Sequence, residues 1–384
     1  TERGVVFSRN AGDPGATWQA LKLNLPTVAV HDLAVKDDKL VLATHGRSMW
    51  IFDDLGVLRN PVPSPPPAAG VHLFPVPDAV RWEIRGAAAD RWNAPNPPHG
   101  ARFYYWLAKE PKGDVTAQVL DAAGTVVANL SSKPKEPTGA SEYVKEEKEQ
   151  LAELALPKGA GVQRGAWDLA WDGAEMIPKG ILDSGYPAIG PEAVPGNYTL
   201  RLTVDGQTVA APFVLRPDPR STASPADLEA QLRFSLQVRD AITRLTRDVV
   251  RLQTVRRQLA ERNDLLAKDE RAKPLIDPAK ALIARLDDLE ARLHNPKAEI
   301  AYDVLAQKGG TKLYSRLAPL LGWVTGGNGA PTAGAREVFA EQSKELAGYE
   351  TELDGLLGKE LAALNDSAGK LGVPVIWVPP AAAK

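Results

Sequence analysis

The sequence predicts a multidomain protein with β structure in its first half and helices in its second half. In residues 1 to about 218, short runs of β-branched and aromatic residues alternate with Gly, Asn, Asp and Pro, which is typical of antiparallel strands joined by turns. After Pro219 the apolar residues recur about every three and a half positions, the spacing of amphipathic helices. We therefore expect a β-rich N-terminal segment, an antiparallel β-sandwich and an α-helical bundle.

The N-terminal segment, residues 1–60, contains several short strands and two recognisable loops. Strands are expected at 4–7, 28–35 and 39–44, and the run from Ala43 to Asp54 indicates a strand, a tight turn and a second strand. The run from Ser8 to Trp18 has the form of a degenerate Asp-box that is stretched by an insertion around Pro14. In such a loop an Asx-type side chain, here Asn10, holds the turn and the Trp packs beneath it.

Taken together, the motifs at 43–54 and 8–18 resemble the closing blade of a bacterial BNR-repeat β-propeller. The whole chain resembles the C-terminal region of the secreted sialidase-like, sortilin-like (WD40/YVTN/BNR-like) proteins described as glycosyl hydrolases. The resemblance implies that residues 1–60 are the last blade, followed by an immunoglobulin-like domain and a helical region. A propeller closes only with about 4 to 8 blades. We therefore expect this chain to be part of a longer polypeptide whose remaining propeller is absent here.

Residues 61–70 are rich in proline and predict a stiff linker to the sandwich at 71–218. An edge strand is expected at 71–75, and a charged insertion at 141–156 favours a short exposed helix. The remaining strands are expected at 101–107, 115–120, 125–130, 165–169, 196–204 and 207–215. Their arrangement resembles an immunoglobulin or fibronectin type III domain, in which Trp167 and Tyr198 would be core anchors.

Residues 224–372 predict a helical bundle, followed by a C-terminal tail at 373–384. The first helix begins at Ser224 as N-cap, with Pro225 in the first turn and Asp227 completing a capping box, and runs to about Arg262. Further helices are expected from 277 to 295, from 313 to 324 with Pro319 interrupting, and after Pro331-Thr332. The Gly-rich run at 326–329 indicates a flexible link between two of them. Each apolar stripe is narrow, so the helices must pack on one another.

The composition excludes several classes of function. A net charge of −2 gives no reason to expect a nucleic-acid partner. The absence of cysteine excludes disulfides, thiolate metal sites and a cysteine nucleophile. No apolar run approaches the roughly 18 to 20 residues that span a bilayer, so we do not expect a transmembrane protein. The five histidines show no helical zinc motif, and only His31 and His45, on neighbouring strands, are placed to form a pair. No metal or cofactor is expected.

No residue is assigned a catalytic role, because a sialidase-like site needs paired carboxylates, an arginine cluster and a tyrosine nucleophile. The candidate binding residues are His45, Arg47, Asp53, Trp82 and Trp92. The first three have a structural interpretation, in which they close a hairpin, and a functional one, in which they lie on the rim of a propeller surface. For the tryptophans the alternatives are core packing and a platform on which sugar rings stack.

The resulting hypothesis is a non-catalytic accessory and interaction region of an exported bacterial propeller protein, secreted, periplasmic or on the cell surface. Its partners would be the N-terminal propeller of the same protein, a surface protein or a polysaccharide. The alternative is part of a sialidase-like glycoside hydrolase whose active site lies on the missing propeller. A third interpretation is a module that self-associates through its helices.

Overall fold

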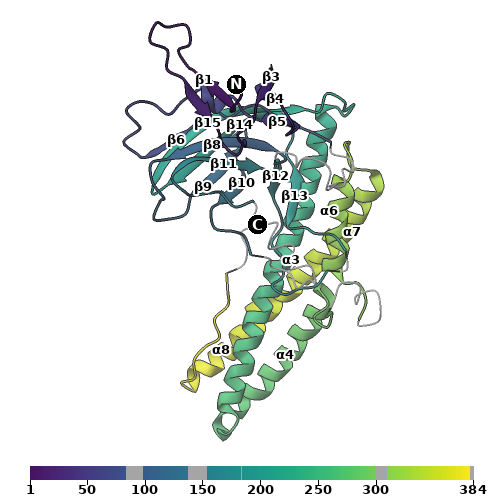
Figure 1. Cartoon of the computed structure of the whole chain (residues 1–384). Helices are drawn as coiled ribbons and strands as arrows, with labels where there is room; N and C mark the ends of the chain where they lie inside the picture. Colours follow the sequence, from purple (N-terminus) through teal and green to yellow (C-terminus); the bar gives the residue numbers. More distant parts are fainter. Residues whose placement is uncertain (84–97, 137–153, 183, 300–308, 381–384) are drawn as a thin grey trace. The chain divides into compact units, whose positions relative to one another are not determined.

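A computed structural model describes residues 1–83, 98–136, 154–182, 184–299 and 309–380 (Figure 1). The protein combines several antiparallel β-sheets with C-terminal helices, as the sequence predicts. It divides into two compact units. The first contains Thr1–Lys133, Leu156–Asp168 and Gly196–Arg216, and the second contains Pro134–Ala155, Leu169–Pro195 and Pro217–Lys384. The expected helix at 141–156 lies almost entirely outside the described residues.

The N-terminal part of the first unit forms two small sheets around one apolar cluster. Strands β1 (Val5–Phe7) and β2 (Gln19–Leu21) form a hairpin, and β3 (Val30–Lys36), β4 (Lys39–Thr44) and β5 (Met49–Phe52) form a three-stranded sheet. The short helix α1 (Gly56–Arg59) follows. The buried cluster consists of Leu21, Leu25, Val28, Leu40 and Leu42. The expected strands are therefore present, and they form two separate sheets.

The loop between β1 and β2 is held by an asparagine side chain. Asn10 Oδ1 accepts a hydrogen bond of 3.1 Å from the Thr17 backbone N–H and another of 3.1 Å from the Ser8 hydroxyl. The expectation of an Asx-type loop is thus confirmed. The expectation that Trp18 packs beneath the loop is wrong, because this side chain is 60% exposed. The insertion around Pro14 lengthens the loop between Asn10 and Trp18 and separates the two parts of the motif.

The rest of the first unit contains a five-stranded and a three-stranded sheet. The five-stranded sheet has the order β10-β9-β14-β15-β7 and the three-stranded sheet β11-β8-β6. Their strands are β6 (Val71–Leu73), β7 (Ala79–Arg81), β8 (Ala101–Leu107), β9 (Thr116–Leu120), β10 (Val126–Ser131), β11 (Gly161–Trp167), β14 (Gly196–Val204) and β15 (Gln207–Pro217). Each strand expected in this segment overlaps an observed one, although β11 begins four residues before and ends two residues before the strand expected at 165–169. Strand β6 is an edge strand as predicted. Along β8, buried residues alternate with half-buried ones, as period-two patterning requires.

An aromatic cluster joins the two sheets. The ring of Trp167 on β11 lies 5.4 Å from that of Tyr198 on β14 and 6.1 Å from that of Phe213 on β15. Trp167 and Tyr198 are 1% and 5% exposed, so their predicted role as core anchors is confirmed. Gly100 allows a close approach here, because a Cβ at this position would lie 1.9 Å from the Trp167 carbonyl oxygen.

The described part of the second unit contains the helices α3 (Pro225–Leu266), α4 (Lys273–Leu293), α6 (Leu313–Thr325), α7 (Ala333–Gly355) and α8 (Leu361–Lys370). Ser224 caps α3 as predicted, since its Oγ accepts from the Asp227 N–H at 3.1 Å and donates to the Asp227 carboxylate at 2.7 Å. The helix extends one turn beyond the expected end at Arg262. The core side chains of α3 are almost fully buried against the other helices. No described helix has the length and apolarity needed to cross a membrane.

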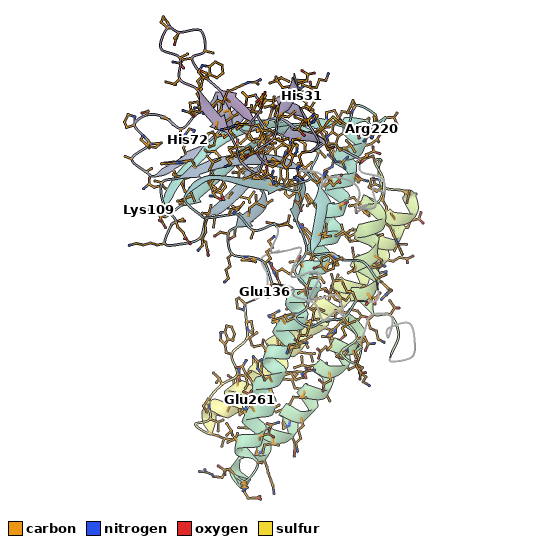
Figure 2. All side chains as sticks on the ribbon, viewed as in Figure 1. His31, His72, Lys109, Glu136, Arg220 and Glu261 are labelled. Atoms are coloured by element: carbon orange, nitrogen blue, oxygen red, sulfur yellow. The ribbon has the colours of Figure 1, made fainter. Side chains whose placement is uncertain are left out.

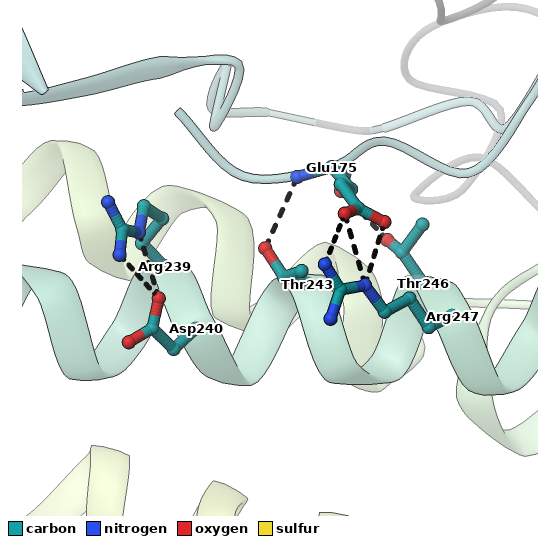
Figure 3. Close-up of polar contacts among 6 residues, drawn as sticks. All are labelled: Glu175, Arg239, Asp240, Thr243, Thr246 and Arg247. Carbon is teal, nitrogen blue, oxygen red and sulfur yellow. Dashed lines mark hydrogen bonds and ion pairs between the residues drawn. The ribbon is translucent and has the colours of Figure 1, made fainter. Parts of the chain in front are cut away.

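A β-hairpin from the middle of the chain also belongs to the helical unit. Strands β12 (Ala170–Asp172) and β13 (Ile189–Glu192) pair, and the segment between them contacts α3 (Figure 3). The Glu175 N–H donates to the Thr243 hydroxyl at 3.2 Å, and the Thr246 hydroxyl donates to the Glu175 carbonyl at 2.9 Å. Arg247 holds the Glu175 carboxylate with contacts of 2.6 to 3.0 Å. Residues 169–195, which the sequence analysis placed within the sandwich, are therefore grouped with the helices.

The C-terminal strap, residues 373–379, lies in extended form against α3 and α8. The Gln258 carboxamide accepts from the Trp377 N–H at 3.0 Å and donates to its carbonyl at 2.9 Å. Asn365 does the same with Ile376, at 2.8 and 3.0 Å. Ile376 is 6% exposed and joins the helical core. The side-chain amides of Gln258 and Asn365 thus bond the backbone N–H and carbonyl groups of Trp377 and Ile376, as a neighbouring strand would.

Candidate functional site

The turn between β4 and β5 presents two of the predicted binding residues, His45 and Arg47. Gly46 and Ser48 adopt positive φ angles of 76° and 61°, and the Thr44 hydroxyl donates to the Ser48 carbonyl at 2.5 Å. The indole N–H of Trp50 donates to the Arg47 carbonyl at 3.0 Å. These bonds fix the backbone, and the His45 and Arg47 side chains are exposed.

The two histidines that the sequence placed on neighbouring strands do meet. The imidazole rings of His31 and His45 lie 5.0 Å apart between centroids and are tilted by 33°. Figure 2 labels His31 on β3. Within the described residues, no group of three or more His, Cys, Asp or Glu side chains could hold a metal ion.

Asp53 lies at the other end of the hairpin from Arg47. Strand β5 separates them, and six residues of extended chain span about 20 Å. Asp53 is half-buried, whereas His45 and Arg47 are exposed. The structure therefore brings His45 and Arg47 together but leaves Asp53 apart, so the three residues do not form one site.

The next residue, Asp54, forms a polar cluster with Tyr104 and Arg102. Asp54 is 7% exposed, accepts a 2.7 Å hydrogen bond from the Tyr104 hydroxyl and lies 3.6 Å from a guanidinium nitrogen of Arg102. Arg102 and Tyr104 are two positions apart on β8, so their side chains lie on the same face of the three-stranded sheet. In the sequence, Asp54 ends the expected strand and Tyr104 belongs to the aromatic run Tyr104-Tyr105-Trp106. No sequence signal links two positions so far apart.

This cluster combines an acid, a tyrosine and an arginine, but its electrostatics suit support rather than chemistry. Burial first, and then the hydrogen bond to Asp54, raises the pKa of Tyr104 well above its ordinary value. A nucleophilic tyrosine requires the opposite shift, because its phenolate is the reactive form. Nη1 of Arg102 is buried and has no hydrogen-bond partner in the described part of the chain. The cluster therefore attaches the end of β5 to β8.

The predicted aromatic candidates have different environments. Trp82, just after β7, is 46% exposed. Trp92 lies outside the described residues. Tyr105, from the same run of aromatics as Tyr104, is fully buried, which agrees with core packing. Of this group, Trp82 presents the largest exposed ring that the structure describes.

The most conspicuous surface near the hairpin is apolar and was missed by sequence analysis. Cross-strand pairing places Ile51 opposite Val41, and Met49 opposite Ala43, on the face of the sheet that points away from the apolar cluster. Ile51 and Met49 are 59% and 72% exposed. Leu33 and Val35 on the edge strand β3 are 56% and 55% exposed, although they share the cluster face.

The continuous apolar runs of β4 (Leu40 to Ala43) and β5 (Met49 to Phe52) were a signal for this surface. Those runs predict strands, but the strand register is needed to show which face remains uncovered. In comparisons with known proteins, no protein-family model, curated protein or solved structure matches the chain.

Proposed function

We propose that this chain is a non-catalytic interaction region of an exported bacterial BNR-repeat propeller protein, and that the β3-β4-β5 sheet packs against the β-sheets of that propeller. The observation that carries the proposal is the apolar character of both faces of this sheet. One face contains Leu40 and Leu42, and the other exposes Ile51 and Met49.

An antiparallel sheet with one solvated face normally alternates apolar and polar residues. Sheet β3-β4-β5 does not, since apolar side chains occupy both sides of β4 and β5. Strands that are covered on both faces by other sheets show this pattern, and a blade inside a propeller is covered in this way. The exposed apolar faces therefore favour further β structure as the natural partner.

The edge of the sheet supports the same partner. Six of the seven residues of β3 are exposed, and within the described residues no strand pairs with its outer edge. An exposed apolar edge is a template for another strand, so proteins normally cover or charge it. Here Leu33 and Val35 remain uncovered between Asp32 and Lys36. A strand laid along β3 would bury both side chains and pair backbone groups at this edge, where the Leu33 N–H now donates to Asp32 at 2.8 Å.

Photo-cross-linking in the longest natural form of the protein tests this proposal. A photoreactive phenylalanine analogue replaces Ile51 or Val35, and cross-linked peptides are identified by mass spectrometry. We expect adducts with β-repeat segments encoded upstream of this chain. A matched control carries the analogue at Trp377, which is also exposed but belongs to the helical unit. Adducts from Ile51 confined to a second copy of the same segment would indicate self-association instead and contradict the proposal.

The alternative is a sialidase-like hydrolase with its active site on the propeller. The cluster around Tyr104 does not favour it, because the raised pKa of this phenol opposes a nucleophilic role. Intact mass and N-terminal sequencing of the native protein separate the alternatives. Upstream blades with Asp-boxes alone would favour binding, whereas blades that also carry an arginine cluster, a tyrosine and acids on their loops would favour hydrolysis.

A further inference from the structure

The helical unit contains a cavity of about 480 Å³ beside the connection from α6 to α7. This volume lies within the range of small-molecule sites, about 300 to 1,000 Å³. The cavity is lined by Gln231, Leu320, Trp323, Val324, Gly327, Asn328, Gly329, Ala330, Pro331, Thr332, Gly334, Ala335 and Val338. All of these residues belong to the second unit.

None of the described residues that line the cavity has a charged side chain. Leu320 and Val324 contribute apolar groups from α6, and Val338 contributes one from α7. Trp323 also lines the cavity and is 74% exposed, so most of its indole surface is open to solvent. A charged ligand would lose its hydration here without gaining an opposite charge. The chemistry of the lining therefore selects a neutral, largely apolar ligand with a flat face that stacks on the Trp323 ring.

Gln231 on α3 supplies a directional polar contact. Its side chain is 6% exposed, and its Nε2 donates to the Val324 carbonyl at 2.7 Å and also to the Gly327 carbonyl. Those two bonds fix the orientation of the carboxamide. Its Oε1 is a hydrogen-bond acceptor on a residue that lines the cavity, and a ligand N–H or O–H can donate to it.

The loop that forms part of the lining is held in place. Gln231 binds the Gly327 carbonyl, and Thr332 caps α7 by accepting from the Ala335 N–H at 3.2 Å. On one side Phe234 packs edge-on against Phe339, with ring centroids 5.3 Å apart. The Gly-rich run, interpreted from the sequence as a flexible link, is thus anchored at both ends. The cavity exists before any ligand binds, so little ordering would oppose binding.

We infer that this cavity binds a neutral aromatic molecule with one hydrogen-bond donor, for which indole is a simple probe. Its ring stacks on Trp323 and contacts Leu320, Val324 and Val338, and its N–H or O–H donates to Gln231 Oε1. The site belongs to the helical unit and is independent of the role proposed for the β3-β4-β5 sheet.

Titration with indole tests the inference by calorimetry and ligand-observed NMR. Benzothiophene is the matched probe, because its fused rings have nearly the same shape but lack the N–H. We expect indole to bind with 1:1 stoichiometry and several-fold more tightly than benzothiophene. The W323A variant should weaken indole binding about three- to tenfold, because it removes one stacked pair. Equal affinity for indole and benzothiophene would overturn the assigned role of Gln231.

Two further variants keep the test decisive. W377A removes an indole that is 61% exposed elsewhere in the same unit, and it should bind indole as the unaltered protein does. V338W fills the cavity from a position that is 39% exposed, and it should abolish binding while the helical circular dichroism and melting temperature are retained. Indole binding that survives both W323A and V338W would place the ligand elsewhere and refute the site. Binding of tryptophan-containing peptides but not of indole would indicate a protein partner and also refute it.

Discussion

The hydroxyl group of Tyr104 donates a 2.7 Å hydrogen bond to Asp54, a residue fifty positions earlier in the sequence. This contact attaches the end of β5 to the face of the three-stranded sheet, where Arg102 also approaches the carboxylate. A buried carboxylate that loses a donor keeps the cost of its desolvation. The bond therefore stabilises the junction between the N-terminal sheets and the rest of the first unit.

The first prediction concerns this contact. Tyr104→Phe removes the donor and leaves the Asp54 carboxylate without it, so the free energy of unfolding should fall by about 1 to 3 kcal/mol. Urea denaturation measures the change. Tyr186→Phe is the matched control, because this tyrosine is 42% exposed and its variant should be neutral. Equal stability of the two variants would mean that the Tyr104 bond contributes nothing.

The second prediction concerns Glu290, which is 1% exposed between α3 and α4. Gln253 donates to its carboxylate at 2.6 Å, His294 lies 3.0 Å away, and Arg256 forms an ion pair with it. Burial acts to raise the pKa of Glu290, but the bonds from His294 and Gln253 and the charge of Arg256 outweigh it and hold the pKa below its ordinary value. The ionised form therefore stabilises the fold above the ordinary pKa, and this contribution is lost as the pH falls below it.

Glu290→Gln should accordingly lower the free energy of unfolding at pH 7 by about 1 to 3 kcal/mol. The difference from the unaltered protein should shrink toward pH 3. Urea denaturation across this pH range measures both effects. A difference that does not depend on pH would show that Glu290 acts through packing and not through its charge.

The third prediction concerns Asp248, whose pKa is shifted in the opposite direction from that of Glu290. Burial, together with the nearby charges of Glu350 and Asp354, raises the pKa of Asp248 from its ordinary 3.8 to about 6. Between these values the unfolded chain is ionised while the native protein still holds its proton. Stability therefore falls as the pH rises from about 4 to about 6. At higher pH the Asp248 carboxylate is ionised in the native protein, and its desolvation costs free energy. The charges of Arg251 and Arg244 offset part of this cost.

Asp248→Asn should raise the free energy of unfolding at pH 7 by about 1 to 2 kcal/mol and leave it nearly unchanged at pH 3.5. Thermal unfolding at the two pH values measures the change. Glu341→Gln, on the exposed surface of α7, controls for the loss of one negative charge. A melting temperature of D248N that is lowered at pH 7 would contradict the repulsion inferred here.

The fourth prediction tests the start of the longest helix. Ser224→Ala removes the oxygen that accepts from the Asp227 N–H, and it should destabilise the helical unit by about 1 kcal/mol. Ser224→Asn restores an acceptor at the same position and should recover most of the loss. If the asparagine variant is as unstable as the alanine variant, the capping bond is not what matters at this position.

Local chemistry made most of the strands and helices predictable. The turn residues around Asp121-Ala122-Ala123-Gly124 and the Ser224-Pro225 helix start mark boundaries that the structure reproduces closely. Strand β8 and strand β14 match their expected ranges, because period-two patterning is strong in both. Helix α4 begins four residues before its expected start at Asp277, with Pro274 in its first turn, where proline is tolerated, and Pro278 inside the helix.

The long-range relationships were not predictable in the same way. Residues 169–195 follow strand β11, and their assignment to the helical unit depends on tertiary contacts such as the bonds from Glu175 to α3. The contact between Tyr104 and Asp54 likewise depends on how distant strands pack. Trp323 lies outside the apolar stripe of its helix, a hint that it lines an open surface, but the role of Gln231 depends on carbonyl groups more than ninety positions away.

The excursion of residues 169–195 also limits how the protein can be divided into fragments. A fragment that stops at Arg216 contains every strand of the first unit, but it also contains the β12-β13 hairpin without the helices that bury Ala174 and Ile177. Such a fragment would expose side chains that the complete chain hides, and it should aggregate. During synthesis this segment emerges before α3 does. The Ile177 N–H donates to the Tyr314 hydroxyl at 3.3 Å, and this bond can form only after Tyr314 has been synthesised.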